Sequence, residues 1–442
     1  MSLMILMLAV ALAFACGLAY LEPRAGVGLV LIGYATIPFA AHISFAGVHV
    51  CTVLALAVAC TRLLIPSEDL PPPRSRRLLP TIPPLGAIAL VAVFLVGSVV
   101  SEILKASSPG GAIGFWLNFV VAPVLIFVMC CDLAERYENF YRLLASGYIA
   151  VAVAQSILAF LVSMDVVRQP YLDDYSKRFW WRIVEESNRQ MGTIDHPLDL
   201  GLLIASAIPL LALIRRAWVT YFSLVALVAG VLVTQSRIAL VGGAAVGGVV
   251  FLILKSSMTT MRRAILAVGV LVSYSVFNAL GAFEAISGRI QDDSGSAEAR
   301  RNAWTVILPD GLRFIPSGVG IQRVKAFVAS QYGLETSPES ALLGYLVGFG
   351  AVLTICFFAG LLWIVMSRLR VDRTVSPGLA SFCIVFVSIQ LYSSISSGST
   401  ATAYILWLCV FFAFAHERDI EPGDQPAPAV TRSRNLGATV SL

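Results

Sequence analysis

Residues 218–254 read WVTYFSLVALVAGVLVTQSRIALVGGAAVGGVVFLIL, and this stretch decides the fold class. Two strongly apolar runs flank a short polar turn, Thr234-Gln235-Ser236-Arg237. Each run approaches the about 20 apolar residues that a helix needs to cross a bilayer. Both runs are apolar on every side, and in lipid only a helix or a closed barrel satisfies every backbone amide and carbonyl. The stretch therefore predicts two membrane-spanning helices joined by a tight turn.

The composition extends this interpretation to the whole chain of 442 residues. Hydrophobic residues make up 58% and charged residues 13%, whereas soluble proteins contain about 45–50% and about 25%. So few charges cannot cover a water-exposed surface, which excludes a soluble nucleic-acid enzyme. The formal net charge of +5 comes from short basic clusters between apolar runs, a pattern of membrane topology rather than of nucleic-acid binding.

About thirteen stretches are apolar enough to span a bilayer. We therefore predict an all-α polytopic membrane protein with about twelve to thirteen transmembrane helices. The candidate spans are 2–21, 25–41, 46–65, 82–101, 111–131, 143–164, 198–214, 217–234, 237–255, 264–282, 340–366, 378–396 and 400–415.

Short basic loops identify the cytoplasmic side, because cytoplasmic loops carry an excess of lysine and arginine. With the basic clusters placed inside, two long polar segments fall on the opposite side, and long ordered loops often carry function. The chain then divides into N-terminal transmembrane helices (1–164), a first extracytoplasmic loop (165–197), central transmembrane helices (198–282), a large extracytoplasmic loop (283–339), C-terminal transmembrane helices (340–415) and a disordered cytoplasmic tail (416–442).

Metal and nucleotide chemistry lack a signature in the sequence. The four histidines form no cluster with cysteines and carboxylates at ligand spacing. Asp173-Asp174 and Asp292-Asp293 are the candidates for a hard cation, but adjacent side chains usually diverge, whereas such ions need several converging oxygens. The chain also contains no P-loop and no Rossmann fingerprint. We therefore expect no metal and no cofactor.

Four polar stretches are the candidates for chemistry. In the first, Arg189–Pro197, Pro197 suits the start of a helix and Asp195 suits a position near its N-cap. The second is the turn Thr234–Arg237. Its arginine either extends to the membrane interface or forms an anion site, in which Gln235 and Ser236 add hydrogen-bond donors at the same depth.

The third stretch is 295–320, where 297–309 has helical composition, with Ala303, Trp304 and Ile307 on a possible apolar face. Arg300 is spaced to form a cation–π pair with Trp304 on the membrane surface. In the fourth, Glu335–Leu342, Ser337 or Glu339 caps the next helix. Alternatively, Glu339 is a carboxylate placed to accept a proton from a substrate hydroxyl.

The order of the four stretches resembles the O-antigen ligase and Wzy-type polysaccharide polymerase superfamily. The shared pattern is an Arg-x-x-Gly-Thr…His-Pro stretch, a Thr-Gln-Ser-Arg turn, a long loop with Arg-x-x-x-Trp and Pro-x-Gly-x-Gly, and a polar residue ahead of Leu-x-x-x-x-x-x-Gly. The resemblance covers about residues 185–365. It implies a GT-C-like bacterial inner-membrane glycosyltransferase with its active site facing the periplasm.

The resemblance also implies the substrates and the roles of individual residues. The donor and acceptor are glycans on undecaprenyl pyrophosphate, and a chain-length-regulating co-polymerase is an expected partner. Arg237, Arg300 and next Arg189 contact the pyrophosphate, together with Gln235, Ser236 and His196. Without a divalent metal, arginines must stabilise the growing charge of the leaving group.

The residue at position 339 distinguishes two hypotheses within the superfamily, a ligase and a polymerase. Ligases usually have His-Asn where this chain has Glu339-Ser340, whereas many polymerases have an acidic residue. We therefore expect a polysaccharide polymerase with Glu339 as general base, which makes O-antigen, capsule or exopolysaccharide. The alternatives are an O-antigen ligase, which transfers polymer to lipid A–core, and a lipid-linked oligosaccharide flippase or transporter.

Overall fold

The structure is a computed structural model. It describes residues 2–41, 44–45, 47–66, 70–71, 83–105, 109–177, 181, 185, 189–236, 239–254, 294–315, 317–334, 338–369, 376–391 and 400–415. Within these residues nearly every element is a helix, and the strands are a two-residue antiparallel pair, β1 (Ser44–Phe45) and β2 (Val48–His49). The predicted all-α architecture is confirmed.

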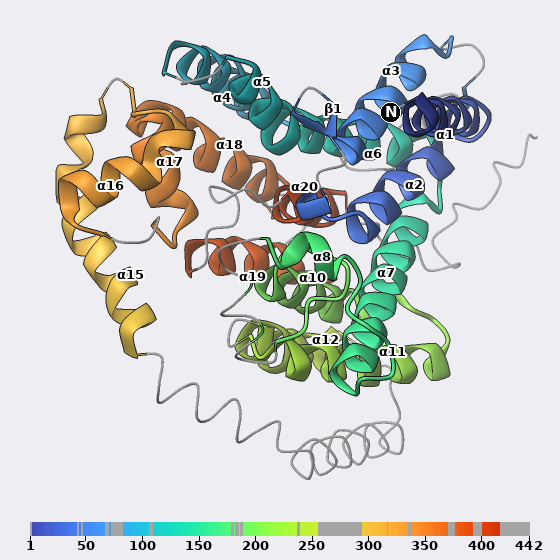
Figure 1. The fold of residues 1–442 in the computed structure, drawn as a ribbon. Helices are drawn as coiled ribbons and strands as arrows, with labels where there is room; N and C mark the ends of the chain where they lie inside the picture. Colours follow the sequence, from blue (N-terminus) through green and yellow to red (C-terminus); the bar gives the residue numbers. More distant parts are fainter. Residues whose placement is uncertain are drawn as a thin grey trace, which may run out of the picture.

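Fourteen α-helices within the described ranges form the bundle (Figure 1). They are α1 (Ser2–Leu21), α2 (Pro23–Thr36), α3 (Val50–Leu64), α4 (Leu85–Lys105), α5 (Pro109–Trp116), α6 (Ala122–Arg136), α7 (Phe140–Ser163), α10 (Pro197–Leu210), α11 (Ala217–Thr234), α12 (Gly248–Leu254), α17 (Ala341–Phe349), α18 (Ala351–Leu369), α19 (Pro377–Leu391) and α20 (Thr400–Phe414).

Shorter or irregular helices complete the described part. They are α8 (Leu172–Tyr175), α15 (Ser294–Ile307), α16 (Val324–Tyr332), the 3-10 helices η1 (Phe39–Ala41), η4 (Leu211–Leu213), η6 (Pro309–Phe314) and η7 (Ile321–Arg323), and the π-helical turns η3 (Leu117–Val121) and η5 (Ala239–Gly247).

Five helices in the described residues are long and apolar enough to cross a bilayer: α4, the continuous helix Gly110–Arg136, α7, α11 and α18. Six shorter apolar helices accompany them. The chain is a polytopic membrane protein, as predicted. The total of about twelve to thirteen spans stays a prediction, because the candidate span 264–282 lies outside the described residues.

One predicted span is divided. The sequence predicts a single helix over 340–366, but α17 ends at Phe349 and α18 begins at Ala351. Gly350 lies between them with φ +98°, a backbone conformation that glycine adopts without strain. A Cβ there would lie 2.7 Å from the amide nitrogen of Gly318. The break therefore makes room for the segment that precedes η7.

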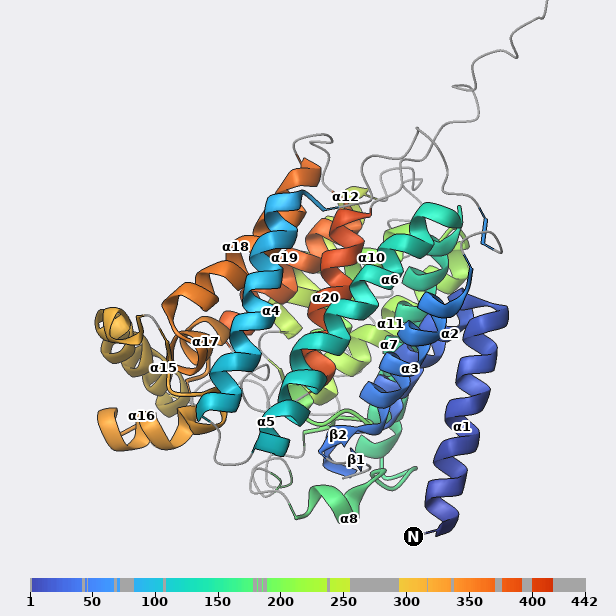
Figure 2. The same ribbon diagram turned by 90° about the horizontal axis from the view of Figure 1, so that it is seen from above.

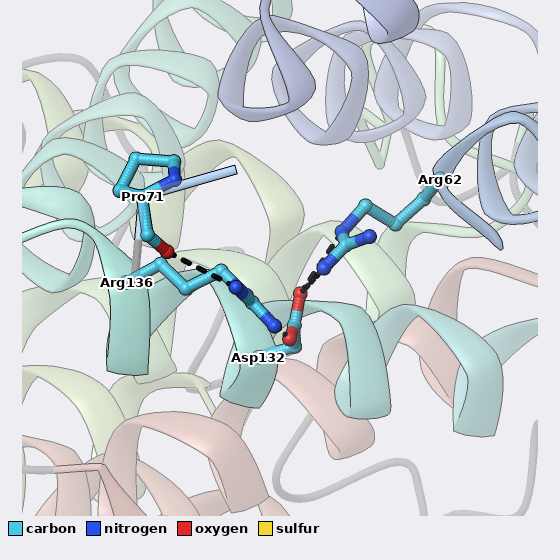
Figure 3. Close-up of polar contacts among 4 residues, drawn as sticks. All are labelled: Arg62, Pro71, Asp132 and Arg136. Atoms are coloured by element: carbon cyan, nitrogen blue, oxygen red, sulfur yellow. Dashed lines mark hydrogen bonds and ion pairs between the residues drawn. The ribbon is translucent and has the colours of Figure 1, made fainter. Parts of the chain in front are cut away.

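The bundle has two chemically different ends. At the end that we call the basic end, Arg62 Nη2 donates to Asp132 Oδ2 at 2.6 Å and Arg136 Nε donates to Oδ1 at 2.9 Å (Figure 3). Arg136 Nη1 also donates to the carbonyl of Pro71 at 3.0 Å (Figure 3). One carboxylate thus ties the last turns of α3 and α6 together.

The opposite end, which we call the loop end, is where α10 and α17 begin and α19 finishes. Ser381 Oγ donates to the carbonyl of Ser206 at 2.7 Å, which joins the first third of α19 to the last third of α10. Near the start of both α10 and α20, Thr402 Oγ1 donates to Asp199 Oδ1 at 2.7 Å. α10 is buried along almost its whole length among α7, α11, α19 and α20. It is the central helix under the loop end.

The large loop forms its own helical group at the side of the bundle. Figure 2 shows α15 and α16 outside the long helices and beside α17. Ala303 and Ile307 of α15 are buried, while Trp304 is partly buried against the core. The apolar face predicted for 297–309 is therefore confirmed. This group brings the charged side of α15 to the beginning of α17.

Candidate functional site

Two candidate residues from distant parts of the sequence meet at the start of α17. Arg300 Nε lies 2.6 Å from Oε2 of Glu339, and the two side chains keep 31% and 38% of their surface exposed. Arg300 thus pairs with Glu339, and the cation–π pair with Trp304 that the sequence suggested stays a prediction. The pair is accessible to a ligand and contains one group that binds anions and one that accepts protons.

The first turn of α17 explains why the Glu339 carboxylate is available. The Oγ of Ser340 accepts a hydrogen bond from the amide of Leu343 at 3.4 Å. The Oε1 of Gln390, at the end of α19, accepts from the amide of Leu342 at 3.0 Å. Ser340 is therefore the N-cap, which corrects the expectation of Ser337 or Glu339. Because other oxygens bind these amides, Glu339 is left to face Arg300.

The first and second polar stretches are joined to each other. Arg189 Nε donates to the carbonyl of Thr234 at 3.1 Å, and the amide of Gln190 donates to the carbonyl of Val233 at 3.0 Å. These carbonyls belong to the last turn of α11, where a positive charge is favoured by the helix dipole. Only 8% of Arg189 is exposed. Its guanidinium thus has a structural role at the end of this helix.

The turn after α11 is sharp. Gln235 has φ +50° and ends the helix in the left-handed conformation. The Oγ of Ser236 then accepts a hydrogen bond from the amide of Ala239 at 3.2 Å, so it caps the next helical segment. Arg237, the principal anion-binding candidate, lies outside the described residues. The structure places the two preceding residues, Gln235 and Ser236, at the loop end.

His196 caps α10 and directly follows Asp195, which the sequence placed near this cap. Its Nδ1 accepts a hydrogen bond from the amide of Leu198 at 3.2 Å, and Pro197 occupies the first helical position, as expected. Asp195 is buried beside this cap. A role of His196 in substrate binding stays a prediction.

Gln155 of α7 is a residue that the sequence did not single out. Its Nε2 donates to the carbonyl of Ala35 and to Thr193 Oγ1, each at 2.7 Å, and its Oε1 accepts from the amide of Thr193 at 3.0 Å. Gly192 has φ +60°, and a Cβ there would collide with Oε1 of Gln155. One buried amide therefore anchors the end of the first loop.

Asp199 of α10 is a second residue that the sequence did not reveal. Its carboxylate is fully buried and accepts the hydrogen bond from Thr402. A buried acid inside a span is costly and often marks a functional position. Its only sequence signal is one charge in an apolar run, in the first turn after Pro197.

The described residues contain no group of three or more histidine, cysteine, aspartate or glutamate side chains that could hold a metal ion. Asp173 pairs with Arg168 at 3.5 Å and Asp174 with Lys177 at 3.4 Å, all on the exposed first loop. These two carboxylates therefore diverge, as expected of neighbours. Asp292 and Asp293 lie outside the described residues.

Together, these features define a polytopic helical membrane protein with polar sites at one end of its bundle. The model of the O-antigen ligase family matches residues 222–358. This match confirms the resemblance to the O-antigen ligase and Wzy-type superfamily. It includes the turn at Thr234, Arg300 and Glu339, whereas Arg189 and His196 precede it. No curated protein matches the chain.

Proposed function

We propose that this protein is a polysaccharide polymerase, a membrane glycosyltransferase that joins oligosaccharide repeat units carried on undecaprenyl pyrophosphate. The observation that carries the proposal is the contact between Arg300 and Glu339. A glycosyl transfer from a lipid pyrophosphate needs a base for the acceptor hydroxyl and positive charge for the leaving group. Glu339 supplies the base and Arg300 supplies the positive charge, and the two groups are in hydrogen-bond contact.

In the proposed reaction, Glu339 takes the proton of an acceptor sugar hydroxyl as that oxygen attacks the anomeric carbon of the donor. The bond from this carbon to the pyrophosphate oxygen breaks, and its electron pair leaves with the diphosphate. Arg300 stabilises the negative charge that grows there. One displacement of this kind inverts the configuration at the anomeric carbon.

The ion pair also suggests how the site changes when the donor binds. In the free protein Arg300 and Glu339 satisfy each other. A diphosphate carries more negative charge than one carboxylate and offers several oxygens to a guanidinium. Binding of the donor therefore draws Arg300 toward the pyrophosphate and leaves the Glu339 carboxylate for the acceptor hydroxyl. The base is released only when a donor is present.

The turn at Thr234 is proposed as the second half of the donor site. Ser236, which precedes Arg237 in the sequence, lies at the loop end, as does the start of α17 beside Glu339. We assign Arg237 to the pyrophosphate, with Gln235 and Ser236 as hydrogen-bonding neighbours. Arg189 acts chiefly by holding this turn through Thr234, and His196 supports the same region from the start of α10.

In the cell, the proposal places the protein in the bacterial inner membrane with the loop end facing the periplasm. The basic end then faces the cytoplasm, as the distribution of arginines favours. Donor and acceptor are both lipid-linked glycans, and a co-polymerase that sets chain length is a proposed partner. No divalent metal and no cofactor takes part in this scheme.

An O-antigen ligase is the second candidate, because the matched family model carries that description. Ligase and polymerase share the donor chemistry and differ in the acceptor. The acidic Glu339, where ligases usually have histidine, favours the polymerase. The third candidate is a flippase or transporter for the same lipid-linked oligosaccharide. Transporters usually place charged residues near the middle of the bilayer. The pair of Arg300 and Glu339 lies instead at the start of α17, at the loop end, which disfavours this candidate.

Purified protein in lipid nanodiscs distinguishes these candidates. The probe is an undecaprenyl-pyrophosphate-linked repeat unit, supplied alone or with lipid A–core. The proposal predicts a ladder of lengthened lipid-linked products in both samples. Transfer to lipid A–core without lengthening would identify a ligase. Movement of the probe across a vesicle membrane without any new glycosidic bond would identify a transporter.

A further inference from the structure

The last turn of α4 is hydrogen-bonded to the glycine-rich segment of the large loop. We call Ser317–Ile321 the glycine turn. The Oε1 of Glu102 accepts a hydrogen bond from the amide of Ile321 at 2.5 Å. The Nζ of Lys105, one turn later, donates to the carbonyl of Gly318. Two oppositely charged side chains of one helix thus hold both ends of a single turn.

The glycine turn is in turn bound to the end of α17. The amides of Val319 and Gly320 donate to the carbonyls of Val347 and Gly348, each at 2.8 Å. A Cβ at Gly318 would collide with the carbonyl of Val347, so the two backbones touch. Gly320 has φ +90°, which also favours glycine. The turn therefore links α4 rigidly to α17.

The placement of Glu102 is unfavourable for the stability of α4 itself. A carboxylate in the last turn of a helix is repelled by the helix dipole, and Glu102 is also fully buried. Its second oxygen and the hydroxyl of Ser101 have no hydrogen-bond partner among the described residues. Its identified hydrogen bond is the one to Ile321, and Lys105 and Arg323 are its positively charged neighbours. A buried acid with this cost and this contact is explained by what it positions.

We propose that Glu102 is a positioning residue for the transfer reaction. It fixes the glycine turn, the turn fixes Val347 and Gly348, and α17 is a short helix that carries this constraint to its start, beside Glu339. A nine-residue helix spans about 14 Å, so a shift at one end moves the other. The expected effect of Glu102 on the rate of transfer rests on the proposed function. Its role in holding the glycine turn does not depend on that function.

Three variants and one control variant test the positioning role in nanodisc-embedded full-length protein. Glu102→Ala removes the acceptor of the Ile321 amide. Glu102→Gln keeps a carbonyl oxygen at the same place and loses the charge. Ser101→Ala is the matched control, because it changes the neighbouring buried hydroxyl, which has no hydrogen-bond partner among the described residues. Lys105→Met removes the hydrogen bond to the carbonyl of Gly318 and leaves Glu102 unchanged.

The first readout is the rate of trypsin cleavage after Arg323 and Lys325, both exposed just beyond the glycine turn, with exposed Arg168 as internal reference. We expect about a tenfold faster cleavage in Glu102→Ala, a smaller increase in Lys105→Met, and the parental rate in Glu102→Gln and Ser101→Ala. A parental rate in both Glu102→Ala and Lys105→Met would overturn the inference. So would a rate in Glu102→Gln as high as in Glu102→Ala.

The second readout is the lengthening of the lipid-pyrophosphate repeat unit. Glu102→Ala should lower kcat about tenfold or more with a smaller change in KM for the donor, and Glu102→Gln should restore most of kcat. A parental kcat in Glu102→Ala would overturn the link to Glu339. If the parent protein itself forms no product, the proposed function fails, while the cleavage rates still decide whether Glu102 holds the loop.

Discussion

Arg300 Nε and Glu339 Oε2 lie 2.6 Å apart, although 38 residues separate the two in sequence. The contact joins the charged side of α15 to the start of α17, and both residues lie within the matched segment 222–358. An arginine and a carboxylate in contact, each about one-third exposed, form an ion pair of small stabilising value. Their arrangement is more readily explained by chemistry than by stability.

Arg300→Ala and Glu339→Gln are expected to show non-additive losses. Each single variant removes one half of the site, and the double variant should lose little more than the worse single variant, because groups that act as a unit are strongly non-additive. The measurement is the initial rate of lengthening for the parent and three variants, with membrane insertion checked by detergent extraction. Losses that multiply would show that the two residues act independently.

Chelation is expected to leave the reaction unchanged. If arginines stabilise the leaving pyrophosphate, excess EDTA should change the initial rate less than about twofold, since each bound cation that mattered would be worth several kcal/mol. The measurement compares EDTA-treated protein with the same protein after Mg²⁺ is added back. A rate that appears only with Mg²⁺ would turn attention to Asp173-Asp174 and Asp292-Asp293.

The anchor of the first loop predicts a sharp difference between two glycines. Gly192→Ala adds a Cβ at φ +60° against Gln155 Oε1, and backbone strain of this kind costs about 1–3 kcal/mol. Gly28→Ala is the control, because nothing lies within 4 Å of its added Cβ. We expect a lower melting temperature and slower lengthening for Gly192→Ala alone. Equal behaviour of the two variants would mean that the anchor is unimportant.

At the basic end, Asp132 offers a test of stability without chemistry. Asp132→Ala leaves Arg62 and Arg136 facing each other without their carboxylate. The three side chains are partly exposed, so the expected loss of stability is about 1 kcal/mol, seen as a lower melting temperature. The rate of lengthening at 25 °C should match the parent. A tenfold slower reaction would place a functional element at this end.

The sequence predicted the fold class well, because long runs of apolar residues show directly that most of the chain is surrounded by lipid. It also predicted the apolar face of α15, since Ala303 and Ile307 repeat at helical spacing. It could not predict Gln155 or Glu102, because a single polar residue in an apolar helix has no periodic signal and its partner lies far away in sequence. The break at Gly350 depends on the packed glycine turn, which the sequence does not place beside it.

The sequence placed one cap wrongly and located the other to within one residue. It assigned the cap of α17 to Ser337 or Glu339, but Ser340 caps that helix. It placed Asp195 near the cap of α10, and the cap is the next residue, His196. A shift of one residue is within the usual uncertainty of a helix boundary. For α17 the shift matters, because it leaves the Glu339 carboxylate facing Arg300.

The most direct test of the account is the rate at which purified Glu339→Gln protein lengthens an undecaprenyl-pyrophosphate-linked repeat unit in excess chelator. Glutamine keeps the shape of the side chain and removes its capacity to take the acceptor proton. The account predicts a rate about 10²–10⁴ below the parent, with the same yield of correctly inserted protein. Polymer formed by this variant at the parental rate and length would contradict it.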